Sequence, residues 1–212
     1  MRALAAIGLC LALAAGTAAA AAANVQSLIL KPAQVGTGYV LFQRTDGIGL
    51  NTRTLDLCGV ANYSSEQLRT ARIQVNYLKP KGTIGVSNEV VSYKPGGTVQ
   101  AMREVIAHAA SCPHHAISPG EQNLPPLTFQ ITRLHDSRLL KGYLAVRVRV
   151  IGKVSGKHVD QTSCAVYQRQ GNVLSGVYSF GAATDAQMQL CLHAAEQSAK
   201  NLRGTVLKGP TA

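Results

Sequence analysis

Apolar and polar residues alternate most regularly between Tyr143 and Ile151, in the segment YLAVRVRVI. The even positions from Leu144 to Val150 are all apolar, whereas Arg147 and Arg149 occupy odd positions. Successive side chains of a β-strand point to opposite faces of a sheet. The pattern therefore predicts a strand with one face in the core and the arginine face in solvent.

Segments of similar character predict six further strands. They contain β-branched or aromatic residues and are bounded by residues that favour turns. The loop KPKGTIG joins two of them as a hairpin, and Gln170–Gly171 predicts a tight turn between the last two. The predicted strands span residues 39–43, 73–77, 86–93, 127–133, 162–170 and 172–181.

Three segments have the features of helices. Ser64 is a favourable N-cap with Gln67 three residues later, which predicts a short helix. Longer helices are predicted for residues 98–112 and 184–204, because apolar residues recur there at helical spacing. Their predicted buried residues are Val99, Met102, Ile106 and Ala109 in the first, and Met188, Leu192, Ala195, Ala199 and Leu202 in the second.

Hairpin-linked strands interrupted by two longer helices are typical of an α+β domain. We therefore expect a single antiparallel β-sheet with helices packed on one face. The chain has no internal repeat and no shift of composition that would divide it. Residues 24–212 have a length that suits one domain.

The first 23 residues have the features of a secretory signal peptide. Arg2 is followed by an apolar run to about Ala15 and then by small residues, and cleavage is expected after Ala23. A bulky Leu9 directly before Cys10 disfavours lipidation of that cysteine. No later segment is long or apolar enough to span a bilayer, so we expect a secreted or cell-envelope protein with no stable membrane span.

Four cysteines remain after the signal peptide: Cys58, Cys112, Cys164 and Cys191. An even number of cysteines in an exported chain predicts two disulfides, with three possible pairings. We favour Cys58 with Cys112 and Cys164 with Cys191, because each pair joins a residue beside a strand to one on a helix expected to pack over it. A zinc site would need closely spaced ligand pairs such as Cys-x-x-Cys, which the sequence lacks.

The formal net charge of the chain is +11. Such an excess favours anionic partners, and we expect an unidentified small-molecule or anionic envelope ligand. Nucleic acid is disfavoured by export and by the scarcity of aromatic residues among the basic ones. The candidate ligand-binding residues are Tyr143, Arg147, Arg149 and Tyr167, although a solvated sheet face would have the same composition.

The sequence contains no strong catalytic or metal-binding motif. Adjacent histidines such as His114 and His115 rarely bind one ion together, and no Gly-x-Ser-x-Gly elbow or phosphate-binding glycine loop is present. We therefore expect no metal, no cofactor and no enzymatic activity. The alternatives are an exported hydrolase that uses His135 or His114, and an interaction protein for another secreted protein.

Several segments resemble the PknH-like extracellular sensor domain family of actinobacterial secreted proteins. They are LDLCG, YSSEQLRTARIQVNYL, VSNEVVSYKPGG, a helix that ends in SCP, and the late pair Cys164 and Cys191. The resemblance extends from about Leu28 to Arg203, within a domain assigned to residues 24–212. It implies one α+β domain with the disulfide pairing favoured above, and a cleft suspected of binding an unknown ligand.

Overall fold

The computed structural model describes residues 25–46, 53–55, 57–58, 63–82, 84–112, 126–181 and 185–206. The predicted signal peptide lies outside these ranges, as do His114 and His115. None of the helices within the described ranges is long and apolar enough to cross a bilayer.

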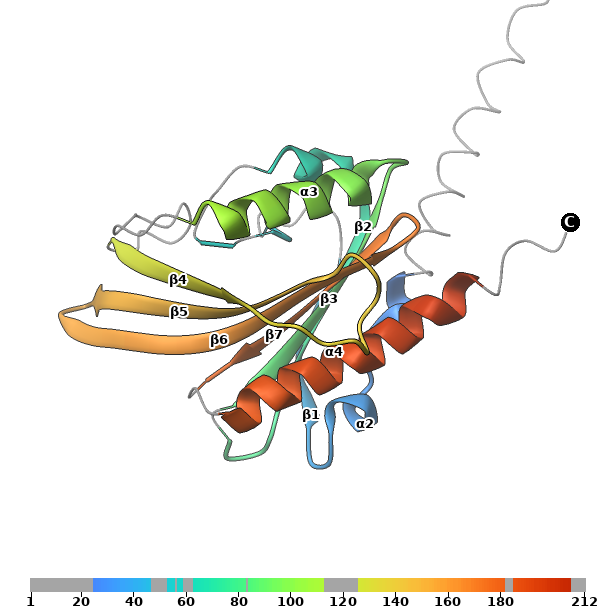
Figure 1. Ribbon diagram of the computed structural model, residues 1–212. Coiled ribbons are helices and arrows are strands. Elements are labelled where there is room, and N and C mark those ends of the chain that lie inside the picture. Colours follow the sequence, from blue (N-terminus) through green and yellow to red (C-terminus); the bar gives the residue numbers. More distant parts are fainter. Residues whose placement is uncertain are drawn as a thin grey trace, which may run out of the picture.

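Seven strands form one antiparallel sheet in the order β1-β2-β3-β7-β6-β5-β4 (Figure 1). Two meanders, β1 to β3 and β4 to β7, meet where β3 pairs with β7, and the chain crosses between them through helix α3 (Gly97–Ala110). The strands are β1 (Val40–Asp46), β2 (Arg69–Leu78), β3 (Gly85–Tyr93), β4 (Leu127–Arg133), β5 (Leu144–Val154), β6 (Lys157–Gln170) and β7 (Val173–Phe180).

Helices cover both faces of the sheet (Figure 1). On one side, here called the α4 face, lie α4 (Asp185–Val206) and α2 (Pro32–Val35). On the other, the α3 face, lie α3 and the short 3-10 helix η1 (Ser64–Leu68). The expected α+β fold with a single antiparallel sheet is confirmed, but the expectation of helices on one face is wrong. The physical reason is the burial of β3 along its whole length, which requires cover on both sides.

Both predicted disulfides are present, one on each face. Cys58 and Cys112 join the segment before η1 to the end of α3, with their Cα atoms 5.8 Å apart. Cys164 of β6 and Cys191 of α4 are bonded with a Cα separation of 6.2 Å. Each bridge thus ties a covering segment to its partner on one side of the sheet.

Two local helix predictions need correction. Ser64 lies inside η1 rather than at its N-cap, which is Tyr63 and makes no capping hydrogen bond with its side chain. The Ser64 hydroxyl donates to Glu104 of α3 instead. In α3, Val99 is 43% exposed rather than buried. The buried side of this helix is instead built around Thr98, Ala101, Met102 and Val105.

Candidate functional site

A cleft of about 310 Å³ opens on the α3 face between the segment around Thr54 and strands β2 to β7. Its volume lies at the lower end of the range of about 300–1,000 Å³ found for small-molecule sites. One wall is apolar, with Phe129, Val148 and Val150 from the outer strands. The floor is polar, with Arg72 and Gln74 from β2, Glu89 from β3 and Tyr178 from β7.

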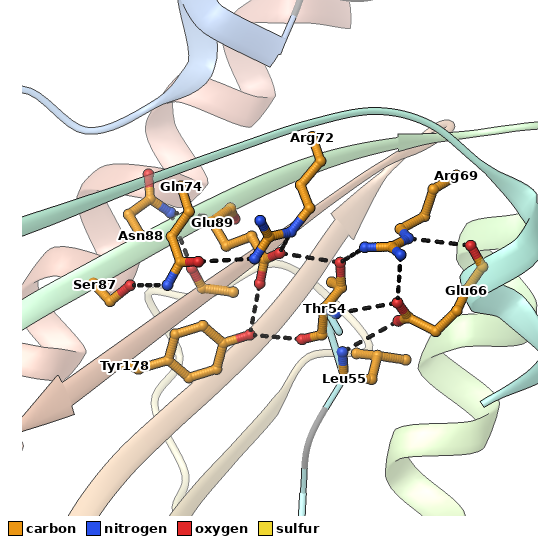
Figure 2. A network of polar contacts seen from close by, with 11 residues as sticks. Thr54, Leu55, Glu66, Arg69, Arg72, Gln74, Ser87, Asn88, Glu89 and Tyr178 are labelled. Atoms are coloured by element: carbon orange, nitrogen blue, oxygen red, sulfur yellow. Dashed lines mark hydrogen bonds and ion pairs between the residues drawn. The ribbon is translucent and has the colours of Figure 1, made fainter. Parts of the chain in front are cut away.

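The centre of the polar floor is a buried ion pair between Arg72 of β2 and Glu89 of β3 (Figure 2). Their side chains are only 1% and 2% exposed. Arg72 Nε donates to Glu89 Oε1, and Arg72 Nη2 donates to Gln74 Oε1 at 2.8 Å. Gln74 in turn donates to the Ser87 hydroxyl at 2.9 Å. The pair is therefore held by neighbours on its own two strands.

A second ion pair fixes the segment that covers the floor. Glu66 accepts hydrogen bonds from the backbone N–H groups of Thr54 and Leu55 at 3.1 and 3.2 Å, and lies 3.2 Å from Arg69 Nη2. The Thr54 hydroxyl donates to Glu89 at 3.0 Å and accepts from Arg69 at 3.1 Å. Thr54 thus connects the two ion pairs into one network (Figure 2).

Tyr178 closes the network from β7. Its hydroxyl donates to the Thr54 carbonyl at 3.2 Å, and its ring packs edge-on against Tyr167 with centroids 5.6 Å apart. The ring can lie across the sheet because residue 176 is a glycine: a Cβ at Gly176 would fall 2.2 Å from the Tyr178 hydroxyl oxygen. The glycine is thus required by a close approach of a side chain.

Burial changes the pKa of two groups in this floor. Burial raises the pKa of Glu89, and the charge of Arg72 and the hydrogen bond from Thr54 oppose that rise. Burial also raises the pKa of Tyr178 well above its usual range, so its phenol stays protonated. Both groups have hydrogen-bond partners within the network: Arg72 and Thr54 for Glu89, and Thr54 for Tyr178.

The structure separates the four predicted ligand-binding residues. Tyr167 is buried and lines the cleft. Arg147 and Arg149 project from the opposite face of β5, where Arg147 lies 3.8 Å from Asp185 and Arg149 pairs with Asp160 at 2.6 Å. Tyr143 is half-buried, and its hydroxyl accepts the backbone N–H of Asp136 at 2.7 Å. A single small ligand therefore does not contact all four residues.

Of the two alternative catalytic residues, His135 is described, and it does not line the cleft. His135 is exposed, and its neighbour Asp136 is held by Arg138, whose hydrogen bonds lower the pKa of that carboxyl. No histidine is among the described residues that line the cleft. Within the described ranges, no three His, Cys, Asp or Glu side chains are grouped as metal ligands.

The prediction missed Arg72, Glu89 and Tyr178. One local signal was available: Glu89 is the only charged residue in the otherwise apolar and small-polar strand GVSNEVVSY. A carboxylate in such a strand needs a cationic partner, because burial of an isolated charge is costly. Arg72 lies on the adjacent strand, 17 residues earlier.

Comparison with known proteins gives a likeness of fold. No family model matches the chain, and no curated protein matches its sequence. The chain is similar in structure to the extracellular domain of PknH from Mycobacterium tuberculosis, with a TM-score of 0.55 and 13% sequence identity. The match covers 85% of this chain and 97% of that one. At this identity the likeness concerns the fold alone.

Proposed function

We propose that the chain is an exported, non-catalytic, sensor-like domain that binds a small ligand in the α3-face cleft. Export is supported by the secretory features of residues 1–23 and by two disulfides, which persist in oxidising compartments. The sensor-like role is supported by the likeness of the fold to an extracellular domain of a PknH protein.

The observation that carries the proposal is the composition of the cleft. A preformed hollow with an apolar wall and a few fixed polar groups is the usual form of a small-molecule site. Here the apolar wall comes from β4 and β5, and the polar groups are held in place by the network around Arg72 and Glu89. A ligand that fits is small and largely apolar, with polar atoms at one end.

Tyr167 is the residue of the predicted set that belongs to this site, since it lines the cleft and supports Tyr178. Tyr143, Arg147 and Arg149 remain a proposal for a separate surface contact with an anionic envelope ligand. That surface contact would have to compete with Asp160 and Asp185, the present partners of the two arginines.

Native mass spectrometry of protein purified from its own source tests the proposal. We expect a retained small molecule of defined mass, released on unfolding. The variant Ser163→Trp places a large side chain in the cleft, because Ser163 lines it. This variant should be recovered without the molecule.

The matched control is Thr162→Trp, which makes the same change at the neighbouring position of β6, on the other face of the sheet. It should retain the molecule. Equal retention by both variants would place the ligand elsewhere. Turnover of the released molecule by the purified protein would favour the exported hydrolase instead.

A further inference from the structure

Four of the five large apolar side chains most exposed among the described residues lie on β1 and β7. Val40, Leu41 and Phe42 are 48%, 49% and 69% exposed, and Phe180 is 39% exposed. Val40 is aligned with Leu78, Leu78 with Gly85, and Gly85 with Phe180, so this row crosses the sheet at one end. Contiguous exposed apolar side chains mark an interaction surface.

Lysines adjoin this apolar row. Lys79 and Lys81 are exposed in the turn between β2 and β3, and Lys79 Nζ lies 5.2 Å from the ring centroid of Tyr39. The turn and the start of β1 lie together at the lower end of the molecule in Figure 1. Apolar tips and cations therefore share one end of the sheet.

A hollow of about 590 Å³ lies beside the two lysines. Tyr39, Lys79 and Lys81 line it from one side, and Ala186 and Leu190 of α4 line it from the other. Lysine is the only charged residue type among its described lining residues. The nearest acid along the chain is Asp185, which is fully exposed and lies 3.8 Å from Arg147.

We propose that this end of the sheet docks peripherally on an anionic phospholipid bilayer. Val40, Leu41 and Phe42 enter the boundary between headgroups and acyl chains, while Lys79 and Lys81 contact lipid phosphates. The inference is independent of the ligand proposed for the cleft, which lies on the α3 face beneath the Thr54 segment.

Two observations favour a lipid surface over a second copy of the chain. β1 contains a bulge between Leu41 and Gln43, with Phe42 as the extra residue, and bulges disrupt the regular edge that strand pairing needs. In addition, two copies joined at this end would bring their lysines together, which like-charge repulsion opposes. An anionic bilayer satisfies both the apolar side chains and the lysines.

Cosedimentation with vesicles tests the proposal, using protein exported by an expressing host and every variant in the same background. We expect binding to mixed phosphatidylcholine and phosphatidylglycerol vesicles that weakens as salt is raised, and little binding to phosphatidylcholine alone. Lys79→Gln with Lys81→Gln should weaken binding about 30-fold, from about 1 kcal/mol per lysine near an anionic surface. Leu41→Ser with Phe42→Ser should weaken it about tenfold or more, through lost apolar burial.

The matched control is Lys153→Gln with Lys157→Gln, which removes the same charge from the exposed end of the β5–β6 hairpin. It should bind like the unmodified protein, as should the cleft variant Ser163→Trp. Equal losses in the two lysine pairs, or no vesicle binding at all, would overturn the proposal. Sedimentation as a dimer that Leu41→Ser with Phe42→Ser dissociates, without vesicle binding, would also overturn it in favour of a second copy.

Discussion

On the α4 face, side-chain amides satisfy the buried polar groups of the covering segments. Asn88 accepts the Leu30 N–H at 2.9 Å, and Gln168 accepts the Leu140 N–H at 3.0 Å and donates to the Ala195 carbonyl at 2.8 Å. On the α3 face, the corresponding central position is held by the ion pair of Arg72 and Glu89. The buried polar contacts thus differ between the two faces of the sheet: neutral amides on the α4 face and an ion pair on the α3 face.

The difference extends to how completely the groups are satisfied. Arg72 Nη1 and the Tyr93 hydroxyl are buried on the α3 face and have no hydrogen-bond partner among the described residues. Burial of such groups without a partner is costly. The α3 face thus has its cleft beside a buried charged network, whereas the buried amides of the α4 face join the covering segments to the sheet.

Removal of the Glu89 carboxylate is expected to give the largest effect. Glu89→Ala leaves Arg72 as a buried charge without its partner, which should lower the free energy of unfolding by about 3–5 kcal/mol. Urea denaturation measures the change. On the α4 face, Gln168→Leu leaves only neutral backbone groups without partners, so its cost should be about 1–3 kcal/mol.

The double variant Arg72→Met with Glu89→Met serves as the control. Replacement of a buried ion pair by apolar residues is often neutral or stabilising, so most of the loss should be recovered. A double variant as unstable as Glu89→Ala would show that the charges themselves are not the cause.

Loss of a disulfide is expected to have the next largest effect. The Cys58–Cys112 bridge closes 54 residues and the Cys164–Cys191 bridge closes 27. From chain entropy alone, their removal should cost at most about 4 and about 3.5 kcal/mol. Paired Cys→Ala variants, compared by urea denaturation, give these values.

Hydrogen exchange distinguishes the two faces in the same variants. Without Cys58–Cys112, we expect amide exchange to accelerate most in α3 and η1 and less in the rest of the chain. The reason is that the α3 face is also interrupted by the cleft. Without Cys164–Cys191, α4 still packs through Ala194, Ala195, Ala199 and Leu202, all fully buried. Uniform acceleration over both faces in the first variant would contradict the proposed division.

The strands and the two longer helices were predictable because their signals are local. Alternation in β5 and helical spacing in α4 depend only on residues near in sequence. The cysteine pairing followed from the same elements, since each bridge joins a helix to what it covers. The placement of helices on both faces was not predictable, because it depends on which strands become central.

The polar residues of the cleft floor escaped prediction for a related reason. Arg72, Glu89 and Tyr178 come from β2, β3 and β7, and they meet only because β7 returns to pair with β3. No local pattern specifies that pairing. Arg147 and Arg149 were chosen because they alternate with apolar residues along β5. Alternation predicts which face of the sheet they occupy, but not that Asp160 and Asp185 lie beside them.

A third test concerns the glycine beneath Tyr178. In Gly176→Ala the new Cβ would lie 2.2 Å from the Tyr178 hydroxyl, so the ring must move and lose its hydrogen bond to Thr54. We expect urea denaturation to show a free energy of unfolding lower by about 1–3 kcal/mol, as is typical when a side chain is added to a packed region. If this contact is the cause, Gly176→Ala should lower the free energy of unfolding only slightly in a Tyr178→Ala background. Equal costs of Gly176→Ala in both backgrounds would point to the strand backbone instead.

The smallest expected effect concerns acid and the contact between α3 and η1. Burial raises the pKa of Glu104, but hydrogen bonds from Ser64, Ser65 and Gln100 outweigh it and hold the pKa below 4.5. A carboxyl with a lowered pKa in the folded state stabilises the protein above its unfolded-state pKa and loses that contribution as the pH falls through the folded-state value. The free energy of unfolding should therefore decline with a steeper slope below pH 4.5.

Glu104→Gln should remove this part of the slope and change stability near neutral pH by only about 0.5 kcal/mol, as for other partly exposed charged contacts. Urea denaturation over a series of pH values measures both quantities, and Ser64→Ala should reproduce part of the effect by removing one donor. Glu104 joins the two helices of the α3 face to each other. Hydrogen exchange at acidic pH should therefore show that η1 loses protection before α4 does. An unchanged slope in Glu104→Gln would mean that other carboxyls account for the acid sensitivity, and that the α3 face is as firmly closed as the α4 face.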